Sequence, residues 1–176
     1  RRLSEQQSPE YLWIGCSDSR VPANEIVGLD PGELFVHRNI ANLAPPRDIN
    51  FLSVLQYSVE VLKVRHIVVM GHGGCGGVTA SLTESKSPLI GEFVTPWVKL
   101  LEGARARVME SGSLNPQFAL ELEGIESSLE NLMSFPWVAE AVTRGDLELH
   151  GAWFAIKHGE LHWRNPKTRR FEIVAP

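Results

Sequence analysis

The sequence predicts an α/β fold, a single domain with a mainly parallel central β-sheet flanked by helices. Short apolar runs at residues 11–15 and 66–70 are typical of strands that are buried on both faces. Strand patterns alternate with helical patterns, which is the order found in parallel sheets with crossover helices. The 176 residues contain no internal repeat and no linker-like segment, so we expect one domain over residues 1–176.

The N-terminal half of the chain predicts three strands and one long helix. Residues 11–15, 33–37 and 66–70 are the three expected strands. Asp48 is a good N-cap for a helix that runs to about residue 63. The polar residues of this helix lie on one narrow stripe and the rest of its surface is apolar. We therefore expect the sheet and a second subunit to cover it.

The C-terminal half predicts four helices and three strands. After the glycine-rich segment 71–77, we expect a helix from Val78 to about residue 84 and a longer one with an apolar face from Val94 to Val108. Asn115 and Pro116 are an N-cap and a first helical position, which open a helix with one apolar stripe. The remaining expected elements are a short helix from Pro136 to about Gly145, a strand at 147–156, and edge strands at 161–164 and 171–174.

Composition and charge exclude several classes of function. Apolar residues make up 43% and charged residues 22% of the chain, as in an ordinary soluble globular protein. The net charge of −4 argues against a nucleic-acid partner or an anionic membrane surface. No apolar run approaches the roughly 18 residues that a membrane span needs. The first residue is Arg1 rather than Met, so we expect a preceding N-terminal arm. The expected location is cytoplasmic, or an organellar stroma or matrix in a eukaryote.

The only two cysteines, Cys16 and Cys75, lie in short segments rich in glycine and serine. A disulfide between them is one interpretation, although secreted domains stapled by disulfides usually carry more cysteines. The expected first strand runs into Cys16, and the expected third strand runs into His72 and Cys75. If these strands are neighbours, both thiols and the imidazole meet at the carboxyl edge of the sheet. Two cysteines and one histidine leave the fourth tetrahedral position of zinc open, as in catalytic zinc sites.

Each of these features also has a simpler interpretation. A His-x-x-Cys spacing alone is weak evidence, and a glycine-rich loop after a strand can instead bind phosphate. The loop here matches neither G-x-G-x-x-G nor a P-loop. Cys16 alone is compatible with a core thiol, and Asp18 with Arg20 is compatible with a surface ion pair.

Three motifs, in order, resemble the signatures of the β-class carbonic anhydrases. They are C-S-D-S-R-V-P at 16–22, P-G-E-L-F-V-H-R-N-I-A-N-L at 31–43 and G-H-G-G-C-G-G-V at 71–78. The later segments N-L-M-S-F-P-W-V and L-H-G-A-W-F are similar to the C-terminal half of that family. The resemblance implies zinc bound by Cys16, His72 and Cys75, and a catalytic pair formed by Asp18 and Arg20. The substrate-binding residues expected from it, partly across a dimer interface, are Gln7, Phe35, Ile40, Tyr57 and Gly76.

The resemblance also implies an activity, which is the reversible hydration of carbon dioxide to bicarbonate and a proton. Zinc-bound hydroxide, oriented by Asp18 and Arg20, would be the nucleophile, and the protein would be a homodimer or a higher homo-oligomer. Two alternatives stay open. One is a hydrolase of carbon disulfide or carbonyl sulfide on the same fold, and the other is a non-catalytic zinc or redox module. A purely structural zinc site would not need Asp18 and Arg20.

Some relatives of this family have a closed form, in which the aspartate leaves its arginine and becomes the fourth zinc ligand. Bicarbonate favours that form by binding beside a tryptophan, an arginine and a tyrosine. Trp13 and Arg38 match the first two positions, but Phe154 stands at the tyrosine position. We therefore expect the open form, with Asp18 on Arg20. For the other histidines we expect structural or surface roles, and these are His37, His66, His150, His158 and His162.

Overall fold

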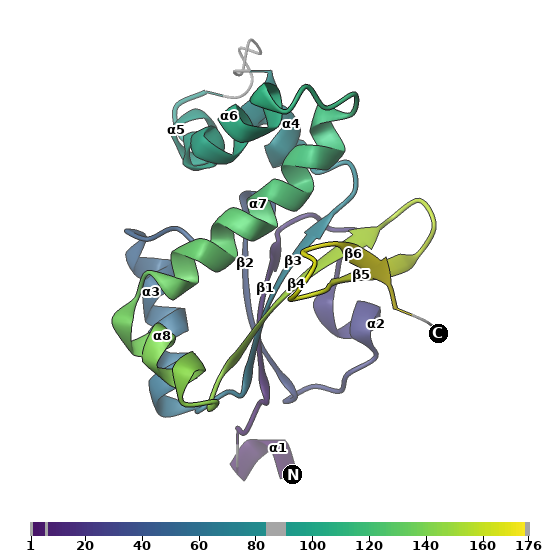
Figure 1. Ribbon diagram of the computed structural model, residues 1–176. Helices are drawn as coiled ribbons and strands as arrows, with labels where there is room; N and C mark the ends of the chain where they lie inside the picture. Colours follow the sequence, from purple (N-terminus) through teal and green to yellow (C-terminus); the bar gives the residue numbers. More distant parts are fainter. Residues whose placement is uncertain (1, 6, 84–90, 175–176) are drawn as a thin grey trace.

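The computed structural model describes residues 2–5, 7–83 and 91–174, and a six-stranded sheet forms its centre (Figure 1). The strand order is β2-β1-β3-β4-β5-β6. The first four strands are parallel, and β5 and β6 add to one edge in antiparallel pairing. The bounds are β1 (Tyr11–Cys16), β2 (Leu34–Asn39), β3 (His66–His72), β4 (Glu148–Ala155), β5 (Glu160–Arg164) and β6 (Phe171–Ile173). The predicted α/β fold with a mainly parallel sheet is confirmed.

Helices cover both faces of this sheet (Figure 1). The α-helices are α1 (Arg2–Glu5), α2 (Ala23–Val27), α3 (Ile49–Gln56), α4 (Gly76–Leu82), α5 (Val94–Val98), α6 (Glu102–Glu110), α7 (Pro116–Met133) and α8 (Pro136–Thr143). Three shorter turns are η1 (Ile40–Asn42), η2 (Tyr57–Val61) and η3 (Lys99–Leu101). In Figure 1, α3, α8 and the long helix α7 lie on one side of the sheet, and α2 lies on the other. None of the described helices is long and apolar enough to cross a membrane.

The core consists of two apolar clusters, one on each face of the sheet. Side chains alternate between the faces of a strand, so Ile67 and Val69 of β3 pack with α3, α7 and α8, whereas Val68 and Met70 pack on the other side. The cluster that contains Val68 and Met70 continues past the carboxyl ends of the strands to α4, α6 and the start of α7. It includes Cys16, which is therefore packed between the sheet and these helices.

The helix expected over residues 48–63 is present but changes its pitch. Asp48 caps it as predicted, because its carboxylate accepts a 2.7 Å hydrogen bond from the amide of Phe51. The α-helix ends at Gln56, and a π-helical turn follows, in which the amide of Leu62 donates to the carbonyl of Tyr57. This hydrogen bond spans five residues instead of the four of an α-helix, so the segment is not one continuous α-helix.

The helix expected around residues 94–108 is divided into α5, η3 and α6. Val98, Leu101 and Ala104 are all buried and lie three residues apart, which is the period of a 3₁₀ turn. A 3₁₀ turn between α5 and α6 therefore keeps all three side chains on the core. α4 begins two residues before the expected start, at Gly76. The expected end of that helix, residue 84, lies outside the described residues.

Helix α2 was not predicted from the sequence. It has only five residues, follows Pro22 and ends at Gly28, which has a left-handed φ of 65°. A helix of this length is too short to produce a recognisable apolar period.

Candidate metal and catalytic site

The two thiols and the imidazole meet at the carboxyl edge of the sheet, as the sequence predicted. Strands β1 and β3 are neighbours, and Cys16 and His72 are their last residues. Cys75 follows three residues later as the N-cap residue of α4. The exposed fractions of Cys16, His72 and Cys75 are 4%, 0% and 1%, so all three donors are buried.

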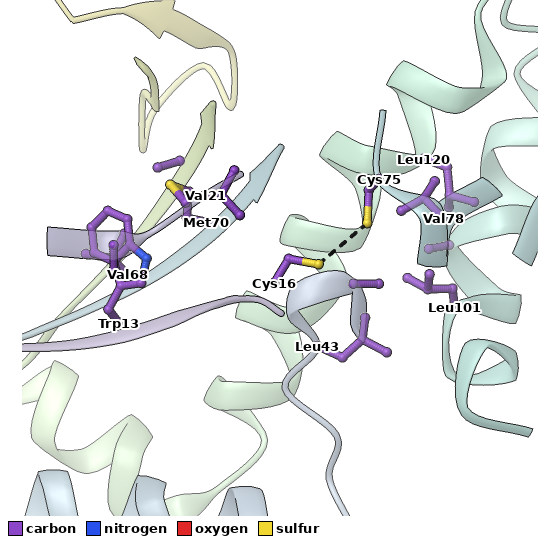
Figure 2. Packing of buried hydrophobic residues seen from close by; sticks show 14 of the residues in the cluster. Trp13, Cys16, Val21, Leu43, Val68, Met70, Cys75, Val78, Leu101 and Leu120 are labelled. Atoms are coloured by element: carbon purple, nitrogen blue, oxygen red, sulfur yellow. Dashed lines mark hydrogen bonds between the residues drawn. The ribbon is translucent and has the colours of Figure 1, made fainter. Parts of the chain in front are cut away.

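The distances between these donors suit a tetrahedral metal ion. The Sγ atoms of Cys16 and Cys75 are 3.9 Å apart (Figure 2), and all three ligand atoms lie within 4.8 Å of one another. Zinc–sulfur bonds of about 2.3 Å at a tetrahedral angle place two sulfurs about 3.8 Å apart. A disulfide requires an S–S distance of about 2.05 Å, and both cysteines are free. The disulfide interpretation is therefore wrong.

The tautomer of His72 also suits a metal ligand. Its Nδ1 lies 3.2 Å from the carbonyl oxygen of Gly73, so this nitrogen carries the proton and donates it. The Nε2 atom is left with a lone pair, is buried, and has no hydrogen-bond partner among the described residues. A buried nitrogen without a partner is costly, and a metal ion between Nε2 and the two sulfurs would remove this cost. The residues present thus fit zinc.

Protons are shared within this buried group. The hydrogen bond between the two thiols lowers the pKa of Cys16 to about 4 and raises the pKa of Cys75, so the pair loses its first proton more readily than its second. Burial opposes a charge on His72, but proximity to the Cys16 sulfur outweighs it and raises the pKa of the imidazole. A divalent cation at this position would displace these protons and stabilise the thiolates.

Two glycines, one before α4 and one in its first turn, shape the segment that carries Cys75. Gly74 has a φ of +67°, a conformation that residues with a Cβ rarely adopt. A Cβ on Gly77 would lie 2.6 Å from Cγ2 of Ile40 and 3.0 Å from Cβ of Ala41. The first turn of α4 can therefore approach η1, which follows β2, only because residue 77 is glycine.

Asp18 and Arg20 form a bidentate pair beside the three donors. Arg20 donates from Nε to Oδ1 of Asp18 at 2.9 Å and from Nη2 to Oδ2 at 2.6 Å, and its backbone amide donates to Oδ1 at 2.9 Å. These bonds hold the pKa of the Asp18 carboxyl well below its usual range. The Oδ2 atom lies 3.8 Å from Nε2 of His72. An ionised carboxylate thus stands next to the place where the donors converge.

Arg38 fixes the backbone of the loop that carries this pair. Its Nε donates to the carbonyl of Cys16 at 2.7 Å, and its Nη2 donates to the carbonyl of Asp18 at 2.6 Å. The next residue, Asn39, bonds both the amide and the carbonyl of Leu43. Through the Arg38 side chain, strand β2 therefore fixes the backbone at the end of β1 and in the loop that follows it.

Sequence reasoning missed Glu121, a residue of α7 that accepts a hydrogen bond from the backbone amide of Cys75. This α7 side chain is only 4% exposed. Its Oε1 accepts from the Cys75 amide at 3.1 Å and from Nε2 of Gln117 at 2.7 Å, and its Oε2 accepts from Nε1 of Trp153 at 3.1 Å. The signal was present, because Glu121 lies four residues before the buried Ile125 and thus on the buried face of the helix.

Comparison with known proteins agrees with this geometry. The sequence matches the family described as carbonic anhydrase over residues 11–161. The carbonic anhydrase of Emericella nidulans is 58% identical over 98 residues, which are 56% of this chain and 41% of that protein. This chain belongs to the β-class carbonic anhydrases. It spans about half the length of the curated relatives that it matches.

Solved β-class carbonic anhydrases share the whole fold. The structure of CcaA superposes with a TM-score of 0.90 at 32% identity and covers 98% of this chain and 87% of its own. A structure described as one of two tetrameric β-carbonic anhydrases from Sordaria macrospora has a TM-score of 0.84 at 38% identity, covering 92% of this chain and 83% of that one.

Only part of the substrate pocket expected of a β-carbonic anhydrase lies next to the donors within one chain. Ile40 lies against Gly77 in the first turn of α4 and is 40% exposed. Gly76 directly follows Cys75, and the space where its side chain would be contains no atom within 4 Å. These two residues border open space beside the site.

The other expected pocket residues lie toward the opposite end of the sheet. Phe35 pairs with Leu12, four residues before Cys16, which is about 13 Å along a strand. The ring of Tyr57 contacts Phe35 at 5.9 Å. Gln7 lies in the chain between α1 and β1, and Figure 1 shows α1 at the end of the sheet away from α4. These three residues therefore do not reach the donors of their own chain.

Two residues of the expected bicarbonate pocket lie at the carboxyl edge of the sheet, because Arg38 pairs with Gly15 and Phe154 pairs with His72, whereas Trp13 lies three residues before Cys16. Trp13 and Phe154 pack in one apolar cluster, and Nε1 of Trp13 is buried without a partner among the described residues. The carboxylate of Asp18 is paired with the guanidinium of Arg20, which is the arrangement expected of the open form.

Proposed function

We propose that this chain catalyses the zinc-dependent, reversible hydration of carbon dioxide to bicarbonate and a proton. The observation that carries the proposal is the juxtaposition of two thiols and an unpartnered imidazole nitrogen with a fixed aspartate–arginine pair. Membership of the β-class carbonic anhydrases supports it. A structural zinc site would have no use for the ionised carboxylate of Asp18 at its edge.

Cys16, His72 and Cys75 would hold the zinc ion. When bound, zinc supplies Lewis-acid chemistry that lowers the pKa of a water molecule to about 7 in the best-known sites. Two thiolates neutralise the ion's charge, so we expect a weaker Lewis acid than in a site with three histidines and activity that favours alkaline pH. Three protein ligands also leave one position for a water molecule or a substrate.

Asp18 would act as a hydrogen-bond acceptor that orients the attacking oxygen. Arg20 fixes its carboxylate with three bonds, so the position of the acceptor is set before substrate arrives. The same bonds keep Asp18 ionised and away from the position of a fourth metal ligand. Arg20 is thus a positioning residue, and Asp18 is the catalytic one.

A second copy of the chain would complete the pocket. Phe35, Tyr57 and Gln7 lie too far from the donors of their own chain, and a symmetric partner could bring them to the site. Tyr57 is 45% exposed and Val61 of the same segment is 59% exposed, so this surface has apolar area to bury. The Sordaria macrospora relative is described as tetrameric. We propose a homodimer or a larger homo-oligomer.

Stopped-flow measurement of carbon dioxide hydration tests the activity. The zinc-loaded protein should turn over, and removal of zinc by a chelator should abolish the rate. Asp18→Asn should retain zinc but lose most of the activity, because the amide is a poorer acceptor and a poorer partner for Arg20. Asp146→Asn is the matched control, since Asp146 pairs with Arg144 at 2.9 Å with the same spacing but on an exposed turn.

Two outcomes would replace the proposal. Zinc-loaded protein that is inactive toward carbon dioxide but active toward carbonyl sulfide or carbon disulfide would change the substrate. Zinc-loaded protein that is inactive toward all three would indicate a non-catalytic zinc module. Equal rates for Asp18→Asn and Asp146→Asn would mean that Asp18 has no role in the reaction.

A further inference from the structure

A second group of metal-ligating side chains lies at the amino end of the sheet. His66 begins β3, and Glu148 and His150 lie on the adjacent strand β4. The register pairs His66 with Glu148 and Val68 with His150. Because side chains alternate along a strand, all three project from the same face of the sheet. This group plays no part in the proposed hydration of carbon dioxide.

The distances within this group are those of metal ligands. Nδ1 of His66 lies 3.1 Å from Nε2 of His150, which lies 3.8 Å from Oε2 of Glu148. The three ligand atoms all lie within 4.8 Å of one another. Zinc–nitrogen bonds of about 2.0–2.1 Å at a tetrahedral angle separate two ligand atoms by about 3.3 Å. The imidazoles are thus already at ligand spacing, and only the 67% exposed Glu148 side chain has to move.

Aromatic rings from two other strands hold the imidazoles in place. Tyr11 of β1 stacks on His66, with ring centroids 5.1 Å apart and an interplanar angle of 26°. Trp163 of β5 packs against His150 with a centroid distance of 5.3 Å. Burial and the neighbouring His66 lower the pKa of His150, and the opposing charge of Glu148 does not cancel this shift. Two imidazoles that neighbouring rings hold in position would bind a metal with little loss of side-chain entropy.

We propose that His66, Glu148 and His150 form a second metal site, which binds a divalent transition ion such as zinc. Two imidazoles and one carboxylate leave a fourth position for water, and imidazole ligands suit zinc, cobalt, nickel and copper. On binding, the hydrogen bond between the two imidazoles breaks, and its proton exchanges through solvent to the other nitrogen of the same ring, so that both rings bind the ion as neutral imidazoles. The ion ties β3 to β4 at their amino ends. The site is independent of Cys16, because His66 and His72 are six residues apart on β3, about 20 Å.

Cobalt titration of the zinc-loaded protein tests the site. The protein is first dialysed against a weak chelator, which removes loosely held metal and leaves the buried cysteine site filled. Cobalt(II) added at pH 7.5 should bind with one further equivalent per chain. Its visible d–d bands should appear without a sulfur-to-cobalt charge-transfer band, because the new ligands are nitrogen and oxygen. The same addition should raise the unfolding temperature.

Variants assign the signal to these side chains. His66→Gln with His150→Gln should abolish the second equivalent, and Glu148→Gln should weaken binding by about tenfold or more. His162→Gln is the matched control, since His162 lies 3.6 Å from Glu160 but has no second imidazole in its pair. It should bind cobalt as the wild type does.

Two results would overturn the proposal. The first is a wild-type protein that binds no more cobalt than the double glutamine variant. The second is cobalt that enters only with a sulfur charge-transfer band and an equal release of zinc, because the cysteine site would then be the only one. Circular dichroism of each variant shows that its fold is retained, and Glu148→Gln, which alters an exposed side chain, gives a second assessment if the double variant unfolds.

Discussion

Replacing Glu121 by glutamine should weaken zinc binding without touching a zinc ligand. The carboxylate of Glu121 accepts three hydrogen bonds, from the Cys75 amide, Gln117 and Trp153. The glutamine side chain has one oxygen and one NH₂ group, so in either orientation at least one buried donor faces another donor. A hydrogen bond to a charged group is worth about 1.5–3 kcal/mol, and we expect the variant to lose about that much stability.

The effect on zinc follows from the bond to Cys75. That bond fixes the backbone from which the thiolate projects, and loss of such outer contacts typically costs about 10–100-fold in metal affinity. Zinc affinity is measured by competition with a chromophoric chelator, and stability by urea unfolding of the same samples.

Glu126→Gln is the control for this prediction. Glu126 lies on the same helix, and its carboxylate forms a bidentate pair with Arg164 that includes a 2.9 Å bond from Nη2. Both side chains are largely buried, but the pair does not contact the metal loop. Its loss should lower stability and leave zinc affinity unchanged. If Glu121→Gln binds zinc as tightly as Glu126→Gln does, the bond to Cys75 does not position the ligand, and the reasoning is refuted.

Two further predictions concern metal loss and pH. Cys75→Ser should lose zinc by elemental analysis and should unfold at a lower temperature, because metal binding contributes to folding; full zinc occupancy would contradict the ligand assignment. Burial lowers the pKa of His37, although the nearby charge of Asp48 opposes this shift. The imidazole of residue 37 therefore binds a proton more readily in the unfolded chain than in the folded one. Stability should then fall as the pH decreases from about 6.5 through the lowered pKa. His37→Gln should flatten this dependence in urea unfolding at a series of pH values, and an unchanged pH profile would count against it.

Besides burial, the orientation of Asn39 also disfavours protonation of His37. Asn39 accepts from the amide of Leu43 through Oδ1 and donates to the carbonyl of Leu43 through Nδ2, so its amide cannot be reversed without loss of both bonds. The same Nδ2 lies 3.2 Å from Nε2 of His37 and donates to it. Protonated His37 would place two donors face to face.

The sheet and the meeting of two thiols and an imidazole at its edge could be predicted because they depend on strong local signals. Continuous apolar runs identify β1 and β3, and the ends of adjacent parallel strands meet at one edge wherever the connections lie. Once β1 and β3 are neighbours, this rule brings Cys16, His72 and Cys75 together, and the resemblance to the β-class carbonic anhydrases adds their role as zinc ligands. The break between α5 and α6 depends instead on tertiary packing. The sequence is compatible with either an α-helical or a 3₁₀ turn there, and burial of Val98, Leu101 and Ala104 favours the 3₁₀ turn.

The supporting contacts could not be predicted, because they join residues far apart in the chain through backbone groups. Arg38 binds the carbonyls of Cys16 and Asp18, which have the same chemistry in every residue and leave no trace in the sequence. Glu121 differs in this respect. A carboxylate on the buried face of an otherwise apolar stripe is unusual, and it must have donors around it.

The arrangement of the pocket leads to a final prediction, that activity depends on assembly. Phe35 and Tyr57 are in contact with each other but about 13 Å or more along the sheet from the donors, so an isolated chain has an open site without its apolar wall. Val61→Asp should disrupt the apolar surface around Tyr57, because a carboxylate there would lose its water in an interface.

Since Val61 is 59% exposed in the single chain, this change should cost little stability. Ile173→Asp on β6 is the matched control, at 58% exposure. We expect Val61→Asp to shift light-scattering mass toward the monomer, retain zinc and lose hydration activity, while Ile173→Asp retains the wild-type mass and rate. A monomeric Val61→Asp protein with full activity would mean that one chain holds a complete site, and that Phe35 and Tyr57 serve only the core.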